Sequence, residues 1–567
     1  MNAMHLLGVI LTCGLAANLA AGEIANGSLD EHVTRIDSKL FEESERDIRA
    51  WLDARIAATG DFGVYPFMRD ELRLEGDTLK VDLNRGGCAD AAAQFFRAYE
   101  MLGDRAYLEA GLKTADFFIQ VQQPAGHFPS GATILRGGKA SAGGGKHPPQ
   151  VARLEDGYQF RPFCLLLYAL RLTGEMKYRD AALRCGEFIT QRAQNPDWGW
   201  CPSYFDTTNP APPTDGETRT GDAGVAGGGS YADSCTTDGF RVSMILYHLT
   251  GEGNCLARSA RLGEWVFATQ MGQGRVRGWA DNYDARNRPV TARNFEGLLI
   301  DPRDFNRFTG PMLVWFHLMT GEERYRRLFE ESYIWLRDQE QPDGWAAEYT
   351  YDGHAACTHD YKSYRYDQPE TWPKAAKPEF SRIKVQLHDA ATWHRLLQEG
   401  GRDGLRRELH APVHADAGSY VAARLAAAMR CTDEKRVLRL AVLTEDGVPG
   451  GIDGRYLERV RLRLAAPDAQ AMPAKDGMGR CGLTRQSWWS PHNRAEPYRP
   501  LLGWASWQFV WDARLARGLI DAKTALPGGR GLELMHLWPD WDVMGDWTTR
   551  CLAVEDWMAV PLAQHSK

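Results

Sequence analysis

Side chains able to bind a metal ion or the acidic group of a ligand are concentrated in one stretch of this sequence. Its first part contains Asp281 and Asp284, whose carboxylate oxygens are hard ligands of the kind that calcium prefers. Its second part contains Arg293 and Glu296, and a guanidinium can hold a carboxylate through two parallel hydrogen bonds. The sequence therefore predicts that Arg293 meets an acidic group of a ligand. A structural ion pair of Arg293 with Glu296 or Asp301 is the alternative interpretation.

Two further acids, Asp156 and Asp238, stand at the start of predicted helices, and each is followed by glycine and an aromatic residue. An aspartate at such a position can cap the helix by accepting a backbone hydrogen bond, which would explain it without a function. It can also face a ligand, and we predict Asp156 and Asp238 as catalytic carboxylates. Asp238 is grouped with Asp281 and Asp284 as a candidate metal ligand, although the sequence contains no linear calcium-binding loop.

Aromatic side chains near these acids are candidates for stacking on sugar rings. The candidate substrate-binding residues, with Glu296 among them, are Trp200, Trp279, Tyr283, Trp345, His359 and Tyr361. Packing in the core is the alternative for the tryptophans, since large aromatic side chains also dominate protein cores. The loop that contains His359 and Tyr361 offers a further alternative, a histidine or tyrosine acting as a base.

An internal repeat predicts the elements that position these residues. A helical stretch, a turn of glycine and acid, a second helical stretch, and a glutamine before a glycine-aromatic loop recur four times. The turn glycines are Gly103, Gly174, Gly251 and Gly321, separated by 71, 77 and 70 residues. Glycine supplies a left-handed cap for the first helix, and the acid starts the second helix near its positive end. The pattern predicts four αα-hairpins.

The polarity of each hairpin predicts how the hairpins pack. The first helix of the second hairpin is apolar on nearly every side, whereas its partner is amphipathic. A helix of the first kind is buried and one of the second kind covers it, and stacked hairpins can close into an (α/α) toroid. We therefore predict an all-α fold with a toroid over 23–400 and an extension over 401–567 that packs on it. Alternating apolar and charged residues in 430–464 allow a β-hairpin in this extension.

Long loops connect the hairpins and contain most of the candidate residues. These loops have roughly 25–35 residues against a usual 4–6, and loops of that length in a compact domain commonly serve a function. Each follows the second helix of a hairpin, so all four are expected on the same rim of the toroid. The loops are 128–154, 202–236, 280–303 and 346–380.

The third of these loops resembles the pectate lyases of polysaccharide lyase family ten and their (α/α)-toroid relatives. In that family a W-x-x-Q-x-D segment precedes P-x-x-A-R-x-Y-E after a similar hairpin. The matching residues are Trp279, Asp284, Pro289, Ala292, Arg293 and Glu296, while Asn282 stands for the glutamine and Phe295 for the tyrosine. The resemblance covers about residues 80–350. The family's W-P-Q loop appears only as His127-Phe128-Pro129, and its usual C-terminal segment is not recognisable after residue 400.

The resemblance implies a polysaccharide lyase that cleaves a pectate-like, uronic-acid-containing polymer by β-elimination, with calcium as a possible cofactor. It implies that Arg293 acts as the base or binds the substrate carboxylate. Elimination needs a base near the proton alpha to the carboxylate and a group that neutralises that carboxylate. Two alternatives use the same architecture: a glycoside hydrolase working through two carboxylates such as Asp156 and Asp238, and a non-catalytic glycan-binding toroid.

The N-terminal sequence predicts an exported protein. An apolar run over 5–21 without charged residues ends in small residues before Glu23, which is typical of a secretory signal peptide over 1–22; an uncleaved anchor is the alternative. We therefore expect a secreted or periplasmic protein. Export permits disulfides. Cys164 and Cys185 fit buried thiols, whereas the candidates for bridges are Cys201, Cys235 and Cys357.

Composition and charge exclude other classes of function. The net charge is −7, which argues against a nucleic acid as partner. No nucleotide, zinc-protease or serine-hydrolase motif is present. The excess of glycine among the 57 glycines is explained by the hairpin turns and two glycine-rich rim loops, and several of the 19 tryptophans stand where the rim loops begin. We expect an anionic polysaccharide as the only partner and a monomer in solution.

Overall fold

The computed structural model describes residues 59–65, 72–83, 88–145, 147–208, 228–231, 234–250, 252–291, 297–342, 344–374 and 387–410, together with isolated positions between 42 and 57 and Arg514. The predicted signal peptide and nearly all of the predicted extension over 401–567 lie outside the described residues.

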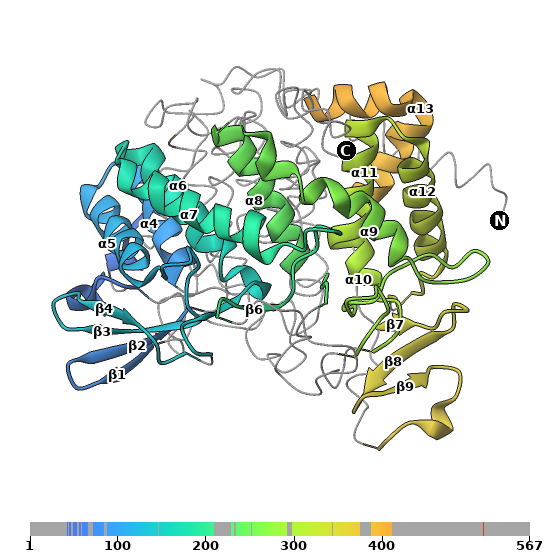
Figure 1. Ribbon diagram of the computed structural model, residues 1–567, viewed down its shortest axis with the longest axis horizontal. Coiled ribbons are helices and arrows are strands. Elements are labelled where there is room, and N and C mark those ends of the chain that lie inside the picture. The colour runs from blue at the N-terminus through green and yellow to red at the C-terminus, as the bar shows by residue number, and fades with distance from the viewer. Residues whose placement is uncertain are drawn as a thin grey trace.

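The described helices form consecutive hairpins that lie side by side in chain order (Figure 1). They are α4 (Cys88–Leu102) with α5 (Arg105–Val121), α6 (Phe160–Thr173) with α7 (Met176–Glu187), α8 (Cys235–Thr250) with α9 (Leu262–Ala268), and α11 (Gly310–Thr320) with α12 (Glu323–Asp338). A further helix, α13 (His388–His410), packs on α11 and α12. The four predicted αα-hairpins are confirmed, and closure of the row into a ring stays a prediction.

Glycine ends the first helix of three hairpins in the left-handed conformation that the sequence predicts. The φ angles of Gly103, Gly174 and Gly321 are 72°, 72° and 75°. The N–H of Gly174 bonds to the carbonyl oxygen of Leu170 at 2.7 Å, which satisfies one of the free carbonyls at the helix end. This conformation turns the chain directly into the second helix.

The third hairpin departs from the repeat. Its second half consists of two short 3-10 segments, η6 (Gly253–Leu256) and η7 (Ser259–Arg261), before the seven-residue helix α9. Gly253 and Asn254, which are poor helix formers, occupy the start of this segment. The prediction of one continuous second helix was therefore wrong at this place.

The glutamine that ends each of the first two hairpins bonds to the following hairpin. The Gln122 Nε2 donates to the carbonyl oxygen of Ala181 in α7 at 2.9 Å. The Gln194 Nε2 donates to the hydroxyl of Ser259 in η7 at 2.8 Å. The corresponding glutamines of the third and fourth hairpins, Gln270 and Gln339, bond instead to nearby backbone carbonyls of Met271 and Trp335.

A glycine in the loop after each of the first two hairpins lies very close to the backbone of the following hairpin. Gly126 and Gly199 have φ angles of 102° and 77°. A Cβ atom at either position would lie 2.2 Å from a backbone oxygen, that of Arg184 or of Arg258. Only glycine allows both the conformation and the close approach.

Aromatic contacts connect the first helices of neighbouring hairpins. Phe96 of α4 lies 5.2 Å from Tyr168 of α6, and Phe240 of α8 lies 4.7 Å from Trp315 of α11, measured between ring centroids. The first helices of the second and fourth hairpins are buried on almost all sides, as their composition predicts. The core consists of two large clusters of buried side chains, one in the first two hairpins and one in the last two, and α8 contributes side chains to both.

Three small antiparallel sheets lie along one edge of the helix row and correct the all-α prediction (Figure 1). The first contains β1 (Leu72–Glu75), β2 (Thr78–Asp82), β3 (Gly131–Leu135) and β4 (Ala140–Ala142); the second contains β5 (Val151–Arg153) and β6 (Tyr204–Asp206); the third contains β7 (Glu348–Tyr349), β8 (Ala355–His359) and β9 (Lys362–Arg365). Most of these strands come from the long loops. The loops therefore emerge on the same rim, as predicted, and are partly ordered as strands; the fold is mostly helical with small sheets.

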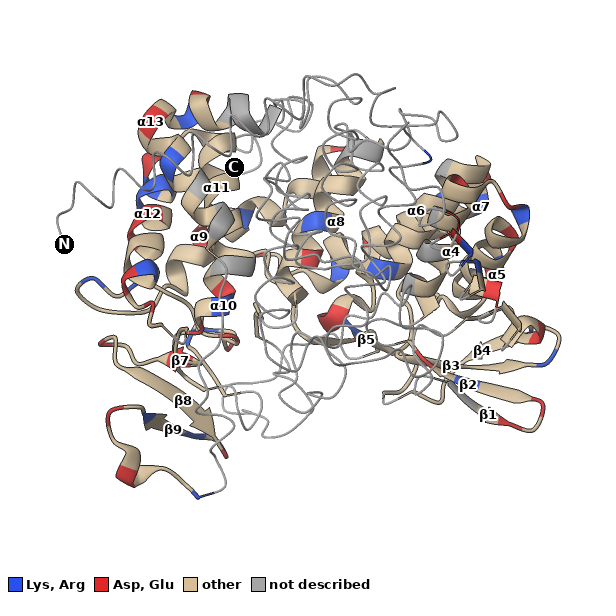
Figure 2. Cartoon of the chain, turned by 180° about the vertical axis from the view of Figure 1, so that it is seen from behind, with Lys and Arg blue, Asp and Glu red and all other residues tan. Residues whose placement is uncertain are grey.

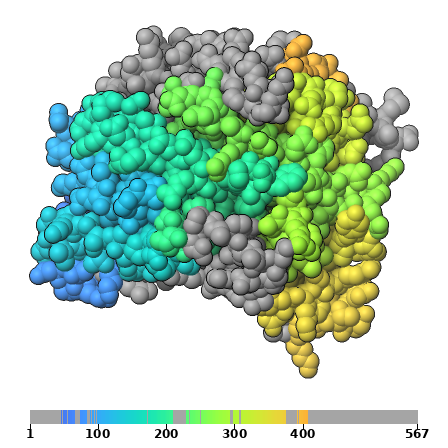
Figure 3. Space-filling view, in the orientation of Figure 1, coloured from blue at the N-terminus to red at the C-terminus, as the bar shows by residue number. Residues whose placement is uncertain are grey.

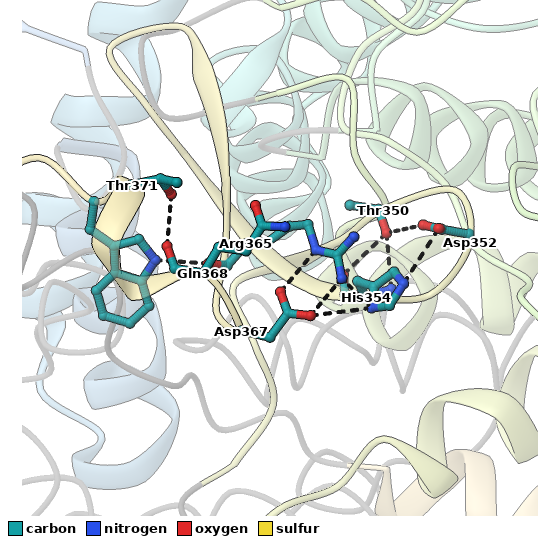
Figure 4. Close-up of polar contacts among 8 residues, drawn as sticks. Thr350, Asp352, His354, Arg365, Asp367, Gln368 and Thr371 are labelled. Carbon is teal, nitrogen blue, oxygen red and sulfur yellow. Dashed lines mark hydrogen bonds and ion pairs between the residues drawn. The ribbon is translucent and has the colours of Figure 1, made fainter.

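The third sheet stands out from the body as a lobe at the lower edge (Figure 3). A polar network holds its outer part, and Figure 4 shows Arg365 of β9 lying between His354 and Asp367. The Arg365 guanidinium contacts the His354 Nδ1 at 2.9 Å and donates to Asp367 at 2.8 Å. These contacts tie the β7–β8 turn to the end of β9.

Helix α13 crosses the predicted boundary at residue 400. The helix is broken at Gly401, whose φ is 57°, and Arg402 just beyond it donates to the carbonyl oxygen of Leu318 at the end of α11 at 3.0 Å. The first residues of the predicted extension therefore pack on the fourth hairpin. Residues 411–513 and 515–567, including the predicted β-hairpin, lie outside the described part.

The described cysteines are buried, and no disulfide joins them. The prediction of buried thiols at Cys164 and Cys185 is confirmed. The bridge candidates Cys201, Cys235 and Cys357 are also buried and unbridged; Cys235 begins α8 and Cys357 lies within β8. No described helix is both long and apolar enough to cross a membrane.

Candidate active site

Four acidic side chains and one arginine meet where the rim loops of the third and fourth hairpins come together. Asp281 lies in the loop after α9, and Glu348 begins β7 after α12. Asp301, Arg303 and Asp304 belong to α10 (Pro302–Asp304) and its N-cap, ahead of α11. Figure 2 shows charged residues around α10 and β7. We call this group the acid cluster.

Backbone hydrogen bonds bring the three segments of the acid cluster together. The Asp301 N–H donates to the Trp279 carbonyl at 2.9 Å. Ile300 and Tyr349 exchange two backbone hydrogen bonds of 2.9 and 2.8 Å. Asp301 then starts α10 by accepting from the Arg303 N–H at 2.7 Å, an N-cap followed by proline at the first helical position.

The carboxyl groups of Asp281 and Asp304 lie within hydrogen-bonding reach of each other. Both side chains are buried. Burial, together with the neighbouring Asp301, raises the pKa of Asp281 to about 7. Burial and the adjacent Asp281 raise the pKa of Asp304 well above its usual range. Two carboxyl groups in hydrogen-bond contact do not readily both carry a charge, so the pair retains at least one proton near neutral pH.

Arg303 links the acid cluster to its surroundings. Its guanidinium binds the Asp301 carboxylate, with Nε 2.9 and 2.8 Å from the two oxygens and Nη2 also in contact. The Asp301 side chain is 2% exposed, whereas that of Arg303 is 32% exposed. The acid cluster therefore has its open side at Arg303.

Glu348 is the fourth acid, and it is 4% exposed. Its Oε1 accepts a hydrogen bond from the Gly297 backbone N–H at 3.0 Å. Burial raises the pKa of Glu348 to about 7, against the opposing effect of the Thr358 hydroxyl and of the Gly297 N–H. If all four buried acids were ionised, the single arginine could not balance their negative charge. Some of the carboxyl groups therefore stay protonated.

Asp156 and Asp238, the predicted catalytic acids, are both buried in arginine ion pairs. Asp156 lies 3.2 Å from Arg153 and has a φ of 58°, in the left-handed region. Asp238 lies 3.0 Å from Arg241, one turn further along α8. Neither is the N-cap that the alternative required: Asp156 lies in η3 (Glu155–Gly157) ahead of α6, and Asp238 lies in the first turn of α8.

The three predicted metal ligands do not meet. Asp284 forms a local turn by accepting from the N–H groups of Arg286 and Arg288, each at 2.9 Å. Asp238 pairs with Arg241 and Asp281 with Asp304. Within the described ranges no three histidine, cysteine or acidic side chains are arranged to hold a metal ion. The described residues thus do not fit a calcium site of this composition.

Four of the predicted sugar-binding aromatics are core residues. Trp200, Trp279, Tyr283 and Trp345 are at most 4% exposed. The Trp279 and Trp345 indoles donate to the carbonyl oxygens of Val266 and Leu336, each at 2.8 Å. Because both ring faces are covered, the structure favours the packing alternative for these side chains over stacking on a sugar.

His359 and Tyr361 lie on the lobe of the third sheet. His359 ends β8, and Tyr361 follows in the turn to β9 with a φ of 64° and 40% exposure. Tyr361 is therefore the predicted sugar-binding aromatic that offers its ring to solvent. Arg293 and Glu296 lie outside the described residues, and their roles stay predictions.

Sequence reasoning missed Asp304 and Glu348 as site residues, although a signal was present. The stretches Trp279–Tyr283 and Trp345–Tyr349 share the pattern W-A-x-x-Y. In both, the tyrosine hydroxyl accepts from the alanine N–H, at 2.7 and 3.1 Å. Because the two stretches have the same local geometry, Asn282 and Glu348 occupy equivalent positions. An alignment of the two repeats would therefore have pointed to Glu348 as the counterpart of a residue in the predicted site.

The sequence matches no protein-family model and no curated protein. Among solved structures, the chain is similar to a family 10 polysaccharide lyase from Cellvibrio cellulosa in complex with trigalacturonic acid, at 14% identity, covering 49% of this chain and 88% of the other, with a TM-score of 0.34. It is also similar to cellobiose 2-epimerase from Spirochaeta thermophila, at 12% identity and coverage of 83% and 97%, with a TM-score of 0.37.

A third similar structure is an α-1,6-mannanase of Salegentibacter sp. in complex with mannotetrose, at 11% identity, covering 49% of this chain and 70% of the other, with a TM-score of 0.27. The chain is thus distantly similar in structure to carbohydrate-active enzymes. These enzymes include a lyase, an epimerase and a hydrolase, so the likeness indicates no specific activity.

Proposed function

We propose that the protein is a polysaccharide lyase that cleaves a uronic-acid-containing, pectate-like polymer by β-elimination. The observation that carries the proposal is the Asp281–Asp304 pair, which combines a proton acceptor and a proton donor on the rim. It lies in the same loop system as the segment that resembles the lyase family. The hairpin repeat and the ordered rim loops support the same class of enzyme.

The pair can perform both proton transfers of the reaction. The ionised Asp281 takes the C5 proton, the electron pair forms the C4–C5 double bond, and the bond from C4 to the glycosidic oxygen breaks. The proton of Asp304 goes to the leaving oxygen. A carboxyl group with a pKa near 7 suits such transfers at neutral pH, because it is available in both states.

Neutralising the substrate carboxylate is a separate requirement of the elimination. We assign this role to Arg293, on the strength of the resemblance, and to Arg303 as a second cation whose side chain reaches the surface of the acid cluster. The mechanism uses no metal step, and calcium enters as a variable of the assay. We further propose that the protein is exported and acts as a monomer, as its N-terminal sequence and composition predict.

A glycoside hydrolase is the second candidate, favoured by the proton held on Asp304. A glycosidase needs a protonated carboxyl and a second carboxylate about 5 Å or more away, so Asp304 would be its acid and an acid other than the adjacent Asp281 its base or nucleophile. The two candidates differ in their products, because only elimination leaves an unsaturated uronate.

An assay of products tests the proposal. The protein is incubated with polygalacturonate, alginate and glucuronan, with Ca²⁺ or with EDTA, while ultraviolet absorbance of the unsaturated product and reducing ends are both measured. Absorbance that rises with reducing ends supports the lyase; reducing ends alone select the hydrolase. Binding with neither product would identify a glycan-binding protein. Asp281→Asn should abolish turnover, and Asp197→Asn, at an exposed aspartate outside the acid cluster, is the matched control.

A further inference from the structure

The segment ahead of α10 is held against β7 as a short added strand. Ile300 and Tyr349 exchange backbone hydrogen bonds of 2.9 and 2.8 Å, and the Gly297 N–H donates to the Glu348 Oε1 at 3.0 Å. The same short segment leads directly into Asp301 and α10. Whatever holds Gly297 and Ile300 therefore also sets the position of Arg303 and Asp304.

Gly297 fits this place for reasons of space. A Cβ atom on it would lie 1.9 Å from the Thr358 hydroxyl oxygen and 3.2 Å from the Glu348 Oε1. Its φ lies outside the left-handed range, so the close approach alone requires glycine. The backbone of this segment is thus packed directly against the side chains of Glu348 in β7 and Thr358 in β8.

The preceding hairpin repeats the same arrangement with an uncharged residue. Asn282, which is equivalent to Glu348 in the W-A-x-x-Y pattern, accepts from the Ser230 hydroxyl at 2.7 Å. Ser230 ends the previous rim loop, as Gly297 lies near the end of the next one, and a backbone bridge joins Ser230 to Asn282. The position before the tyrosine therefore holds the end of the preceding rim loop in both hairpins.

A glutamate at position 348 brings an ionisable group to a place where the uncharged Asn282 of the preceding hairpin makes the equivalent contact. Glu348 is 4% exposed, and the Gly297 N–H and the Thr358 hydroxyl act on its carboxyl group as hydrogen-bond partners. Burying a carboxyl group with so few partners costs free energy. Retaining the acid is reasonable where its charge acts on neighbours, and Asp281 and Asp301 are within its electrostatic reach.

We propose that Glu348 is a positioning residue of the active site: it anchors Gly297 and thereby places Asp301, Arg303 and Asp304 against Asp281. The anchoring stands by itself, whereas its effect on turnover rests on the proposed function. Glutamine at this position keeps the accepting oxygen and removes the charge, so Glu348→Gln should preserve the anchor. Glu348→Ala removes both.

Hydrogen exchange of the full-length protein tests the anchor without any substrate. In Glu348→Ala, overlapping peptides that cover 297–301 should exchange the Gly297 and Ile300 amides at least about tenfold faster than wild type, because a hydrogen bond to a carboxyl group is lost. In Glu348→Gln the rates should stay within about threefold. The exposed Glu370→Ala in η9 (Pro369–Thr371) is the control and should behave as wild type.

Unchanged exchange in Glu348→Ala would overturn the proposal, and so would equal loss of protection in the alanine and glutamine variants. If Glu348→Ala does not fold, Gly297→Ala replaces it. That substitution should raise exchange over 297–301 through its clash with Thr358, and adding Thr358→Ala should reduce the effect. Failure of Gly297→Ala to change exchange would also contradict the anchor.

Kinetics then separate positioning from general destabilisation. On a polymer that the protein cleaves, Glu348→Ala should lower kcat at least about tenfold with little change in KM. Glu348→Gln should shift the acidic limb of the pH profile to lower pH, since it removes a charge near Asp281. If no polymer is cleaved, the proposed function fails while the exchange result still decides the anchor.

Discussion

At the scale of single residues, the proposed chemistry depends on a pair of buried carboxyl groups that retains a proton. Asp281 lies early in the rim loop after α9 and Asp304 ends α10, and burial keeps a proton on the pair close to neutral pH. Asp156 and Asp238, by contrast, are each neutralised by an arginine three residues away. An acid that must exchange protons near neutral pH needs a raised pKa, which the buried carboxyl pair provides and an ion pair with arginine does not.

Removing the proton donor should lower activity and change its pH dependence. In Asp304→Asn an amide can still donate to Asp281 but cannot release a proton, so kcat should fall about 10²–10⁴-fold. Wild-type kcat/KM should show an apparent pKa near 7, and that pKa should shift in the variant. Initial rates across pH 5 to 9 measure both effects. An unchanged rate in Asp304→Asn would remove the pair from the mechanism.

The same pair should make stability depend on pH. The folded-state pKa of Asp281, about 7, lies above the unfolded value of 3.8, so between these values the native state binds more protons than the unfolded state. Stability therefore falls as pH rises through this window, by on the order of a few kcal/mol for the acid cluster. Melting temperatures at pH 5 and pH 8.5 should show a smaller difference in Asp304→Asn than in wild type. Asp197→Asn should keep the wild-type difference.

At the scale of elements, the turn between β8 and β9 is strained where it is most exposed. Asp360 and Tyr361 have φ angles of 52° and 64°, a conformation that favours asparagine and glycine in two-residue hairpin turns. A bulky side chain there costs on the order of 1 kcal/mol. Strain in an exposed aromatic on the rim is consistent with a role in holding the substrate.

Two substitutions of Tyr361 separate binding from strain. Tyr361→Ala and Tyr361→Gly both remove the ring and should weaken binding of uronate oligomers by up to about tenfold, since aromatic contacts contribute about 0.5–1.5 kcal/mol. Only Tyr361→Gly should also stabilise the fold, because glycine relieves the left-handed conformation. Titration calorimetry and thermal melts measure the two effects. Wild-type affinity in both variants would exclude Tyr361 as a sugar platform.

At the scale of the whole molecule, stability depends on contacts between successive hairpins. Each hairpin buries its first helix only when its neighbours are present, as in other stacked repeats. The hydrogen bonds of Gln122 and Gln194 and the aromatic contact between α8 and α11 connect adjacent hairpins. The order of the rim loops, and so the geometry of the acid cluster, therefore depends on these contacts between hairpins.

A core substitution between hairpins tests this dependence. Phe240 is 4% exposed and contacts both Trp315 and Phe316. Phe240→Ala should cost about 3–5 kcal/mol and lower the melting temperature by several degrees, while activity at a temperature well below the transition is kept. Met176→Ala, at a side chain that is 53% exposed, is the control. Equal melting temperatures for the two variants would show that the packed contact between α8 and α11 does not stabilise the fold.

The amino-acid sequence by itself determined the hairpins and the common rim. Glycine at Gly103, Gly174 and Gly321, and the helical periodicity around them, are local signals, and local signals specify turns and helices. The tyrosine and tryptophan of W-A-x-x-Y were visible too, but their burial was not. A pattern of residue types cannot distinguish a ring that stacks on sugar from one that fills the core.

Only the tertiary structure decided which acids belong together. Asp281, Asp304 and Glu348 come from three segments up to 67 residues apart, and backbone bonds such as that between Ile300 and Tyr349 bring them into contact. Their raised pKa values follow from burial and from one another, which are properties of the packed rim and not of any single segment. The sequence could therefore predict a rim with acids, whereas the acid that carries the proton was selected by the packing of the rim.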